Sequence, residues 1–340
     1  MSDKVLKTFA LDSMPWPTID PFLFCVHHVD NYPAGDARMA PATGVSGRQI
    51  GMDFSGKDGW SMYHGDVVPG FPGHPHRGFE TVTIARNGFI DHSDSLGARA
   101  RFGHGDVQWM TAGKGVVHSE MFPLVHADAP NPTELFQIWL NLPRAKKLVE
   151  PHFTMFWSEN VPHKTVVDDA HKSTHVTVIA GAFDDLKPLS PPPDSWASSP
   201  ESSLAIWTAK MEPGASFDLP VESRDCVRTL YFFAGSTLAV DGQTVARGHG
   251  VVVEPSVPVK LVNGDQPAEI LVLQGRPIGE PVAQHGPFVM NHPGEIRQAM
   301  IDYQETQFGG WPWATDGPVH ERHLGRFAVH GDGRQEQPEG

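Results

Sequence analysis

The sequence of 340 residues has little cysteine and no long run of apolar residues. Its two cysteines, Cys25 and Cys226, form no disulfide framework, and such sparse usage is typical of a reducing compartment. No segment approaches the roughly 20 apolar residues of a membrane-spanning helix, and the N-terminus carries no apolar run of signal-peptide length. We therefore expect a cytoplasmic protein that does not enter a membrane.

Positive charge is also scarce. The chain has 26 Lys and Arg residues against 40 Asp and Glu residues, so its formal net charge is −14. Proteins that follow a phosphate backbone need a basic surface, which this composition does not favour. Direct binding to nucleic acid is therefore not expected. Nothing in the sequence marks an oligomer interface, so we expect a monomer.

Glycine and proline, by contrast, are abundant, with 34 and 31 residues. They indicate many turns between short strands. Apolar and β-branched residues between these turns predict one series of strands in residues 48–141 and another in residues 175–275. The first series consists of GRQIGMDF, FETVTIA, GFIDHSD, ARARFG, DVQWMTA, VVHSEMF and the alternating segment 134–141. The second consists of HVTVIAG, SLAIWTAKM, RTLYFFAG, TLAVDG, GVVVEP, VKLVNG and EILVLQG.

The length of the chain allows two domains, each with its own core. The strand pattern weakens after Pro143, so we predict an N-terminal domain of residues 1–149 and a C-terminal domain of residues 150–340. One helix is predicted near the C-terminus, in NHPGEIRQAMIDYQETQF, with Asn291 as its cap. Its apolar residues recur at helical spacing and should cover a sheet. They are Ile296, Ala299, Met300 and Tyr303.

Histidine is the residue type that stands out, with 19 in the chain. His74 and His76 lie two residues apart, so both imidazoles project to the same face of an extended strand. This motif is weak alone, because about one His-x-His is expected by chance in such a composition. His118 and Glu120 repeat the spacing in GVVHSEMF, and the strands between the two motifs allow them to pair. Three imidazoles and one carboxylate predict a site for one first-row divalent metal ion.

Two other histidine-containing segments are weaker candidates. His92 and Asp94 share a strand face and could form a polar pair near a barrel mouth, but we favour ordinary strand-edge polarity. His27 and His28 are adjacent, so on a strand they face opposite ways and at most one could point at a shared site.

The strings HPHRGFETVT, DHSDSLG, GDVQWMTAGKGVVHSEM, ELFQIWLNLP and GPFVMN resemble the pirin family of the cupin superfamily. The resemblance implies an all-β bicupin fold, with two stacked antiparallel β-barrels of jelly-roll type and a short C-terminal helix. It also implies one metal ion, bound only in the first barrel, on His74, His76, His118 and Glu120. Fe(II) is the expected ion, although this donor set also accepts Mn, Co, Ni, Cu or Zn.

The identity of the carboxylate ligand stays open. Cupins generally take it from the first motif, shortly after the second histidine, and Glu80 occupies that position. A period of two places Glu80 on the same face as His74 and His76, so geometry alone does not exclude it. We prefer Glu120 as the ligand and place Glu80 in the pocket. Either residue, if not ligated, could accept a substrate proton.

The resemblance also implies a function. Bacterial proteins that resemble this chain cleave flavonols such as quercetin with O2 as 2,3-dioxygenases, releasing carbon monoxide. The leading hypothesis is therefore an oxidoreductase that acts on a small aromatic hydroxyketone, with the metal as Lewis acid. The alternative is a non-catalytic regulatory protein, similar to animal pirins, whose binding to a protein partner depends on the metal or its redox state.

Overall fold

Two compact units make up the chain, for which a computed structural model describes residues 4–339. Val26–Glu159 and the residues from Glu280 onward form one unit, here called the first barrel. Residues up to Cys25 and Asn160–Gly279 form the other, here called the second barrel. This division differs from the predicted domains 1–149 and 150–340 at both chain ends. The reason is long-range pairing, because an N-terminal strand joins the second barrel and a C-terminal strand joins the first.

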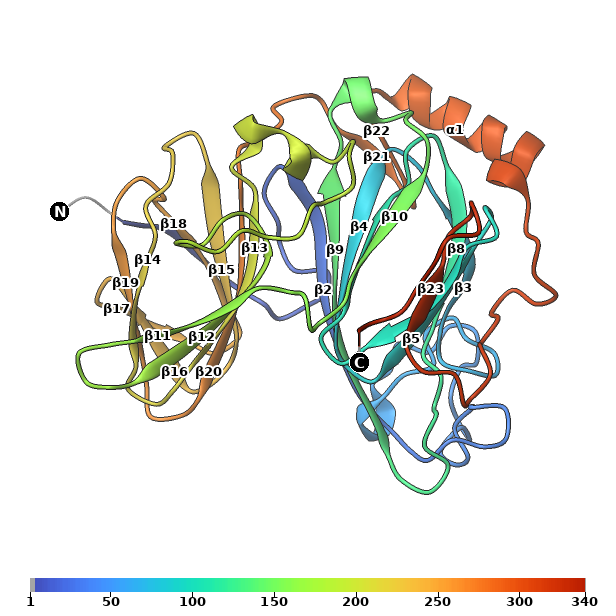
Figure 1. Cartoon of the computed structure of the whole chain (residues 1–340), viewed down its shortest axis with the longest axis horizontal. Helices are drawn as coiled ribbons and strands as arrows, with labels where there is room; N and C mark the ends of the chain where they lie inside the picture. Colours follow the sequence, from blue (N-terminus) through green and yellow to red (C-terminus); the bar gives the residue numbers. More distant parts are fainter. Residues whose placement is uncertain (1–3, 340) are drawn as a thin grey trace. The chain divides into compact units, whose positions relative to one another are not determined.

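The first barrel contains a five-stranded and a six-stranded sheet and a separate hairpin (Figure 1). The five-stranded sheet has the order β10 (His152–Phe156), β7 (Val107–Thr111), β4 (Phe79–Asn87), β9 (Asn131–Asn141), β2 (Phe22–Tyr32). The six-stranded sheet has the order β24 (Gln335–Glu336), β23 (Phe327–Val329), β6 (Arg99–Gly103), β5 (Phe89–Asp94), β8 (Val116–Met121), β3 (Gly70–His76). The hairpin pairs β21 (Ala283–His285) with β22 (Phe288–Met290).

The second barrel contains a seven-stranded and a four-stranded sheet. The larger has the order β1 (Val5–Ala10), β18 (His249–Val253), β15 (Val227–Ala234), β20 (Ala268–Gly275), β13 (Ala205–Met211), β12 (Ser173–Ala180), β11 (His163–Val167). The smaller has the order β14 (Ser216–Leu219), β19 (Val259–Asn263), β16 (Thr237–Val240), β17 (Gln243–Ala246). The predicted two-barrel, mostly β fold is therefore confirmed. All seven segments predicted as strands in residues 175–275 overlap observed strands.

The single α-helix among residues 4–339, α1 (Pro293–Thr306), packs on the outside of the first barrel. Its buried Ile296 and Ala299 form one apolar cluster with Val117 of β8 and with Phe288 and Met290 of β22. The helix is confirmed, but the predicted cap is wrong, because the residue before the first turn is His292 rather than Asn291. The Glu295 carboxylate accepts hydrogen bonds from the backbone N–H groups of both residues, which satisfies donors at the helix start.

The described part of the chain also contains five short 3-10 helices: η1 (Lys57–Gly59), η2 (Arg144–Lys146), η3 (Trp196–Ser198), η4 (Pro200–Ser202) and η5 (Gln307–Gly309). No helix among residues 4–339 has the length and apolar character needed to cross a membrane. The predicted strand GRQIGMDF is wrong, because these residues form an irregular loop before η1. Its apolar side chains Ile50, Met52 and Phe54 are exposed, so no core holds them in a strand.

Candidate metal centre

The antiparallel pair β3 and β8 brings three predicted ligands together. His74 lies directly opposite His118 in this pair, and His76 is two residues further along β3. The ring centroids of His74 and His76 lie 4.5 Å and 4.9 Å from that of His118. One potential ligand atom from each of the three rings lies within 4.8 Å of the others. Such spacing allows all three imidazoles to bind one ion.

A β-bulge in β3 sets which side chains face these histidines. Phe71 pairs with Glu120, and His74 pairs with His118, so β3 has one residue more than β8 over this interval. The extra residue lets Phe71 share a face with His74 although an odd number of positions separates them. Gly70, with φ 133°, permits the close approach of the two strands, because a Cβ atom there would lie 2.4 Å from the Glu120 carbonyl oxygen.

Burial keeps the three imidazoles neutral. It lowers the pKa of His74 to about 4 and holds the pKa of His76 and His118 well below their usual range, and neighbouring imidazoles lower all three further. The His74 Nδ1 lies 2.8 Å from the Pro72 carbonyl oxygen, so Nδ1 carries the proton and Nε2 keeps a free lone pair. Buried His76 Nδ1 and both ring nitrogens of His118 have no hydrogen-bond partner among residues 4–339. Neutral imidazoles with unused nitrogens fit a transition-metal ion.

Glu120 faces the same barrel interior as His118, two residues further along β8. Its Oε1 lies 3.0 Å from the Thr83 hydroxyl of β4, and its Oε2 accepts a 3.2 Å hydrogen bond from the Gln137 amide of β9. Burial raises the pKa of this carboxyl, while the neighbouring His92 and the two hydrogen bonds oppose the rise. The carboxylate is not part of the three-histidine group within 4.8 Å. Its predicted role as a ligand therefore stays a proposal.

Glu80 does not share the interior face. It lies in β4 next to Thr81 and three residues before Thr83, whose side chain faces Glu120, so the alternation of the strand turns Glu80 outward. Its Oε1 accepts a 2.6 Å hydrogen bond from the Thr111 hydroxyl of β7. The alternation of a single strand does not extend from His76 to Glu80, because β3 ends at His76 and a turn with Gly78 at φ 84° separates it from β4.

His92 and Asp94 of β5 lie at the site rather than at an exposed strand edge. Their exposed fractions are 0% and 2%, and His92 Nε2 lies 3.3 Å from Asp94 Oδ2. The His92 ring centroid is 5.5 Å from that of His118. The interpretation as ordinary strand-edge polarity is therefore wrong. Their shared face was visible in the sequence, but the pairing of β5 with β8 was not.

A chain of aromatic rings leads from the histidines to the surface. Phe71 lies 6.4 Å from His74 and 5.1 Å from Tyr63, and Tyr63 lies 5.5 Å from Phe54, measured between ring centroids. Phe54 is 54% exposed. His28 joins this chain through a 2.9 Å hydrogen bond between its Nδ1 and the Tyr63 hydroxyl. The rings form an apolar wall beside His74 that ends at the protein surface.

His27 is turned away from this wall, with its Nε2 2.9 Å from Glu134. The prediction that His27 and His28 face opposite ways is confirmed.

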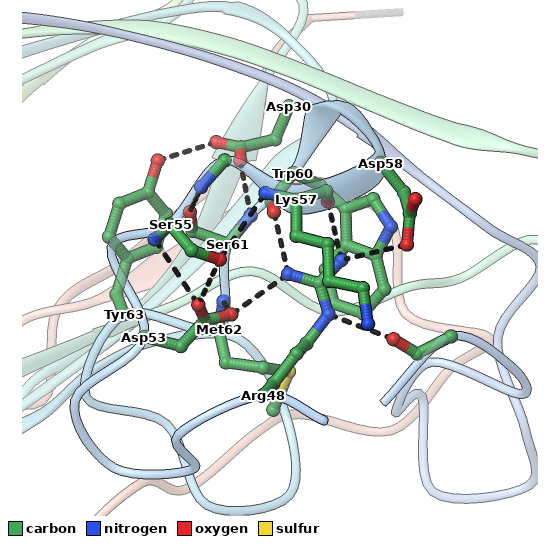
Figure 2. A network of polar contacts seen from close by, with 12 residues as sticks. Asp30, Arg48, Asp53, Ser55, Lys57, Asp58, Trp60, Ser61, Met62 and Tyr63 are labelled. Atoms are coloured by element: carbon green, nitrogen blue, oxygen red, sulfur yellow. Dashed lines mark hydrogen bonds and ion pairs between the residues drawn. The ribbon is translucent and has the colours of Figure 1, made fainter. Parts of the chain in front are cut away.

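Buried charges hold the loop that carries Phe54 and Tyr63 (Figure 2). The Arg48 guanidinium stacks 3.3 Å from the centroid of the Trp60 ring and donates to Asp53 Oδ2 at 2.9 Å. It also donates to the backbone carbonyls of Gly44, Lys57 and Trp60. These contacts fix a loop without regular strands, so the ring wall rests on a rigid support.

Asp30 fixes the other end of the network. Its carboxylate accepts 2.8 Å hydrogen bonds from the Ser61 backbone and from the Tyr63 hydroxyl (Figure 2). Burial raises the pKa of Asp30 to about 6, although these hydrogen bonds oppose the rise. Sequence reasoning missed Arg48 and Asp30, because nothing local shows that residues so far apart in the chain meet.

Comparison with known protein families identifies the family to which the chain belongs. The family model described as Pirin matches residues 17–140, and the model described as Pirin C-terminal cupin domain matches residues 206–309. The chain belongs to the pirin family. Human pirin is 33% identical over 252 residues, which are 73% of this chain and 80% of the human protein. The predicted family is confirmed.

Pirin relatives also include proteins named for an activity. A Pseudomonas aeruginosa protein with the provisional name quercetin 2,3-dioxygenase is 34% identical over 237 residues, covering 69% of this chain and 78% of that protein. The solved structure of quercetin 2,3-dioxygenase from Acinetobacter baumannii matches with a TM-score of 0.69 and 25% identity. It covers 90% of this chain and 98% of that one.

The second barrel offers different chemistry at the matching strand pair. The pair β14 and β19 lies at the edge of its sheet, as β3 and β8 do in theirs. In this pair Phe217 faces Leu261 and Leu219 faces Val259. All four side chains are buried in the apolar core of this barrel. Among the described residues, only His74, His76 and His118 form a group of three or more potential ligands within 4.8 Å.

Proposed function

We propose that this pirin is a metal-dependent dioxygenase that cleaves a flavonol-like aromatic hydroxyketone with O2. The observation that carries the proposal is the group of three neutral imidazoles, two of them buried and that of His74 partly buried, beside the buried carboxylate of Glu120. In this proposal His74, His76 and His118 hold the ion, and Glu120 completes the donor set or acts as base. When bound, a divalent first-row ion such as Fe(II) supplies Lewis-acid polarisation of the substrate oxygens.

Glu120 is the group placed to accept the substrate hydroxyl proton. Burial raises the pKa of its carboxyl, which makes the carboxylate a stronger base than an exposed glutamate. Thr83 and Gln137 fix its two oxygens, so the base keeps one orientation. Glu80 is turned to the opposite face of β4 and is not needed for this step.

Aromatic side chains flank the three histidines, which suits a flat substrate. The His76 ring lies 5.4 Å from Trp139 and 5.0 Å from Phe79, which come from the paired strands β9 and β4 of the other sheet. Phe71 covers the His74 side. Rings on two sides of the histidines exclude water and can stack on a planar ligand.

Oxygen uptake by the purified protein tests this function. Protein loaded separately with Fe, Mn, Co, Ni or Cu is mixed with quercetin while O2 consumption and carbon monoxide release are followed. We expect turnover with at least one ion and none in the His118→Ala variant. Absence of turnover with all five ions would overturn the proposed activity.

A second candidate function is metal-dependent binding of a protein partner without turnover. The favouring observation is a set of exposed apolar side chains in the loop that borders the site: Val45, Ile50, Met52, Phe54 and Val67. A pull-down with wild-type protein and His118→Ala tests it. Loss of a partner in the variant, with no oxygenase activity in the wild type, would support this function instead.

A further inference from the structure

His92 occupies a position next to the proposed base. In the pairing of β5 with β8, His92 lies directly opposite Glu120, and Asp94 lies opposite His118. Directly opposed residues project to the same face of a sheet with neighbouring side chains. His92 is therefore an interior residue of the first barrel, yet its nitrogens are outside the three-histidine group within 4.8 Å.

Asp94 fixes the orientation and the tautomer of His92. The Asp94 Oδ1 accepts 2.9 Å hydrogen bonds from the backbone N–H groups of Leu96 and Ala98, which anchor the carboxylate. Its Oδ2 faces His92 Nε2 at 3.3 Å. A carboxylate oxygen accepts hydrogen bonds, so Nε2 is the ring nitrogen that donates to Asp94, and in this tautomer Nδ1 keeps a lone pair.

The His92 Nδ1 is buried and has no hydrogen-bond partner among residues 4–339. A buried acceptor without a partner costs free energy. The neighbours of this ring include His118 and Phe153 besides the opposed Glu120, and none of them donates a hydrogen bond to Nδ1. The lone pair suits a hydroxyl group brought by a ligand. This arrangement differs from His74, whose Nδ1 is already engaged by the Pro72 carbonyl.

We propose that His92 is a substrate-binding residue whose Nδ1 accepts a hydrogen bond from a ligand hydroxyl other than the one that meets the metal. The inference rests on the proposed function and narrows its substrate class to aromatic hydroxyketones with at least one further hydroxyl. Asp94 is the positioning residue that holds the ring. Ligands with the hydroxyketone alone should bind less tightly, because His92 Nδ1 then stays unpaired.

The affinities of two ligands for three proteins test the hydrogen bond between His92 Nδ1 and the ligand hydroxyl. Anaerobic titration gives the dissociation constants of quercetin and of 3-hydroxyflavone, which lacks every hydroxyl except the metal-binding one. The proteins are wild type, His92→Phe and His92→Asn. Phenylalanine keeps a ring without nitrogen, whereas asparagine places an amide atom near the position of Nδ1. Elemental analysis verifies equal metal content, and His163→Phe, at an exposed position in the second barrel, is the control substitution.

We expect wild type and the control to prefer quercetin over 3-hydroxyflavone by about tenfold, the size of one hydrogen bond to a buried group. His92→Phe should lose this preference, and His92→Asn should regain part of it. A ratio of dissociation constants that is the same in wild type and His92→Phe would overturn the inference and leave the proposed function standing. Failure of wild type to bind either ligand would overturn both.

Discussion

Gln137 holds Glu120 by a 3.2 Å hydrogen bond from its amide nitrogen to Oε2. The two residues come from different sheets of the first barrel, β9 and β8, so the bond crosses the interior beside the three histidines. Thr83 lies within hydrogen-bond distance of both side chains, 3.0 Å from Glu120 Oε1 and 2.6 Å from Gln137 Oε1. The carboxylate is therefore oriented by neighbours that need not bind the metal.

Replacing Gln137 by leucine should lower turnover about tenfold, because the variant loses one charge-assisted hydrogen bond that orients the base. Metal content should not change, since no proposed ligand is altered. Steady-state oxygen uptake together with elemental analysis measures both quantities. Equal turnover in the variant and wild type would show that Gln137 does not position Glu120.

Replacing the carboxylates of Glu120 and Glu80 by neutral amides should change kcat to different extents. Glu120→Gln removes the base and should lower kcat by at least about a hundredfold, the usual contribution of a positioned general base. Glu80→Gln keeps an acceptor for Thr111 on the outer face and should leave kcat within about threefold. Oxygen uptake of both variants at equal metal content makes the comparison. The opposite order of the two effects would contradict the assigned faces.

The sequence predicted the parts of the site that depend on strand alternation alone. His74 with His76, and His118 with Glu120, each lie within one strand, and a period of two places each pair on one face. The alternation of residues 134–141 likewise predicted a strand with two occupied faces. Buried Phe136 lies on one face, and on the other Gln137 reaches Glu120.

Features that interrupt a strand were not predictable in the same way. The bulge between Phe71 and His74 and the turn at Gly78 each change the side to which later residues point. The inward Phe71 and the outward Glu80 follow from these two interruptions. Pairing between distant segments, such as β5 with β8 or β23 with β6, depends on the whole barrel rather than on local pattern.

The buried Arg48 should be essential for the stability of the loop that supports the ring wall. Arg48→Met leaves Asp53 without its guanidinium partner and three backbone carbonyls without their donor. Removing one partner of a buried ion pair costs about 3–5 kcal/mol of unfolding free energy. Urea unfolding should show this loss, and limited proteolysis should cut within residues 44–64. A loss below about 1 kcal/mol would contradict the assigned role.

Asp30 should make stability depend on pH. Its pKa is raised from 3.8 to about 6 in the folded protein, so stability is lost as pH rises through this range and the buried carboxyl ionises. The loss is at most about 3 kcal/mol between about pH 4 and about pH 6. Asp30→Asn cannot ionise, and its urea-unfolding free energy should lack this decrease. An unchanged pH dependence in the variant would refute the assignment.

The number of metal ions per chain tests the central claim most directly. Elemental analysis of metal-loaded wild type, His118→Ala and His249→Ala, the last at the start of β18 in the second barrel, compares the two barrels. We predict one tightly bound ion per chain in wild type and His249→Ala and almost none in His118→Ala. A full equivalent of metal in His118→Ala would contradict a metal centre built on His74, His76 and His118.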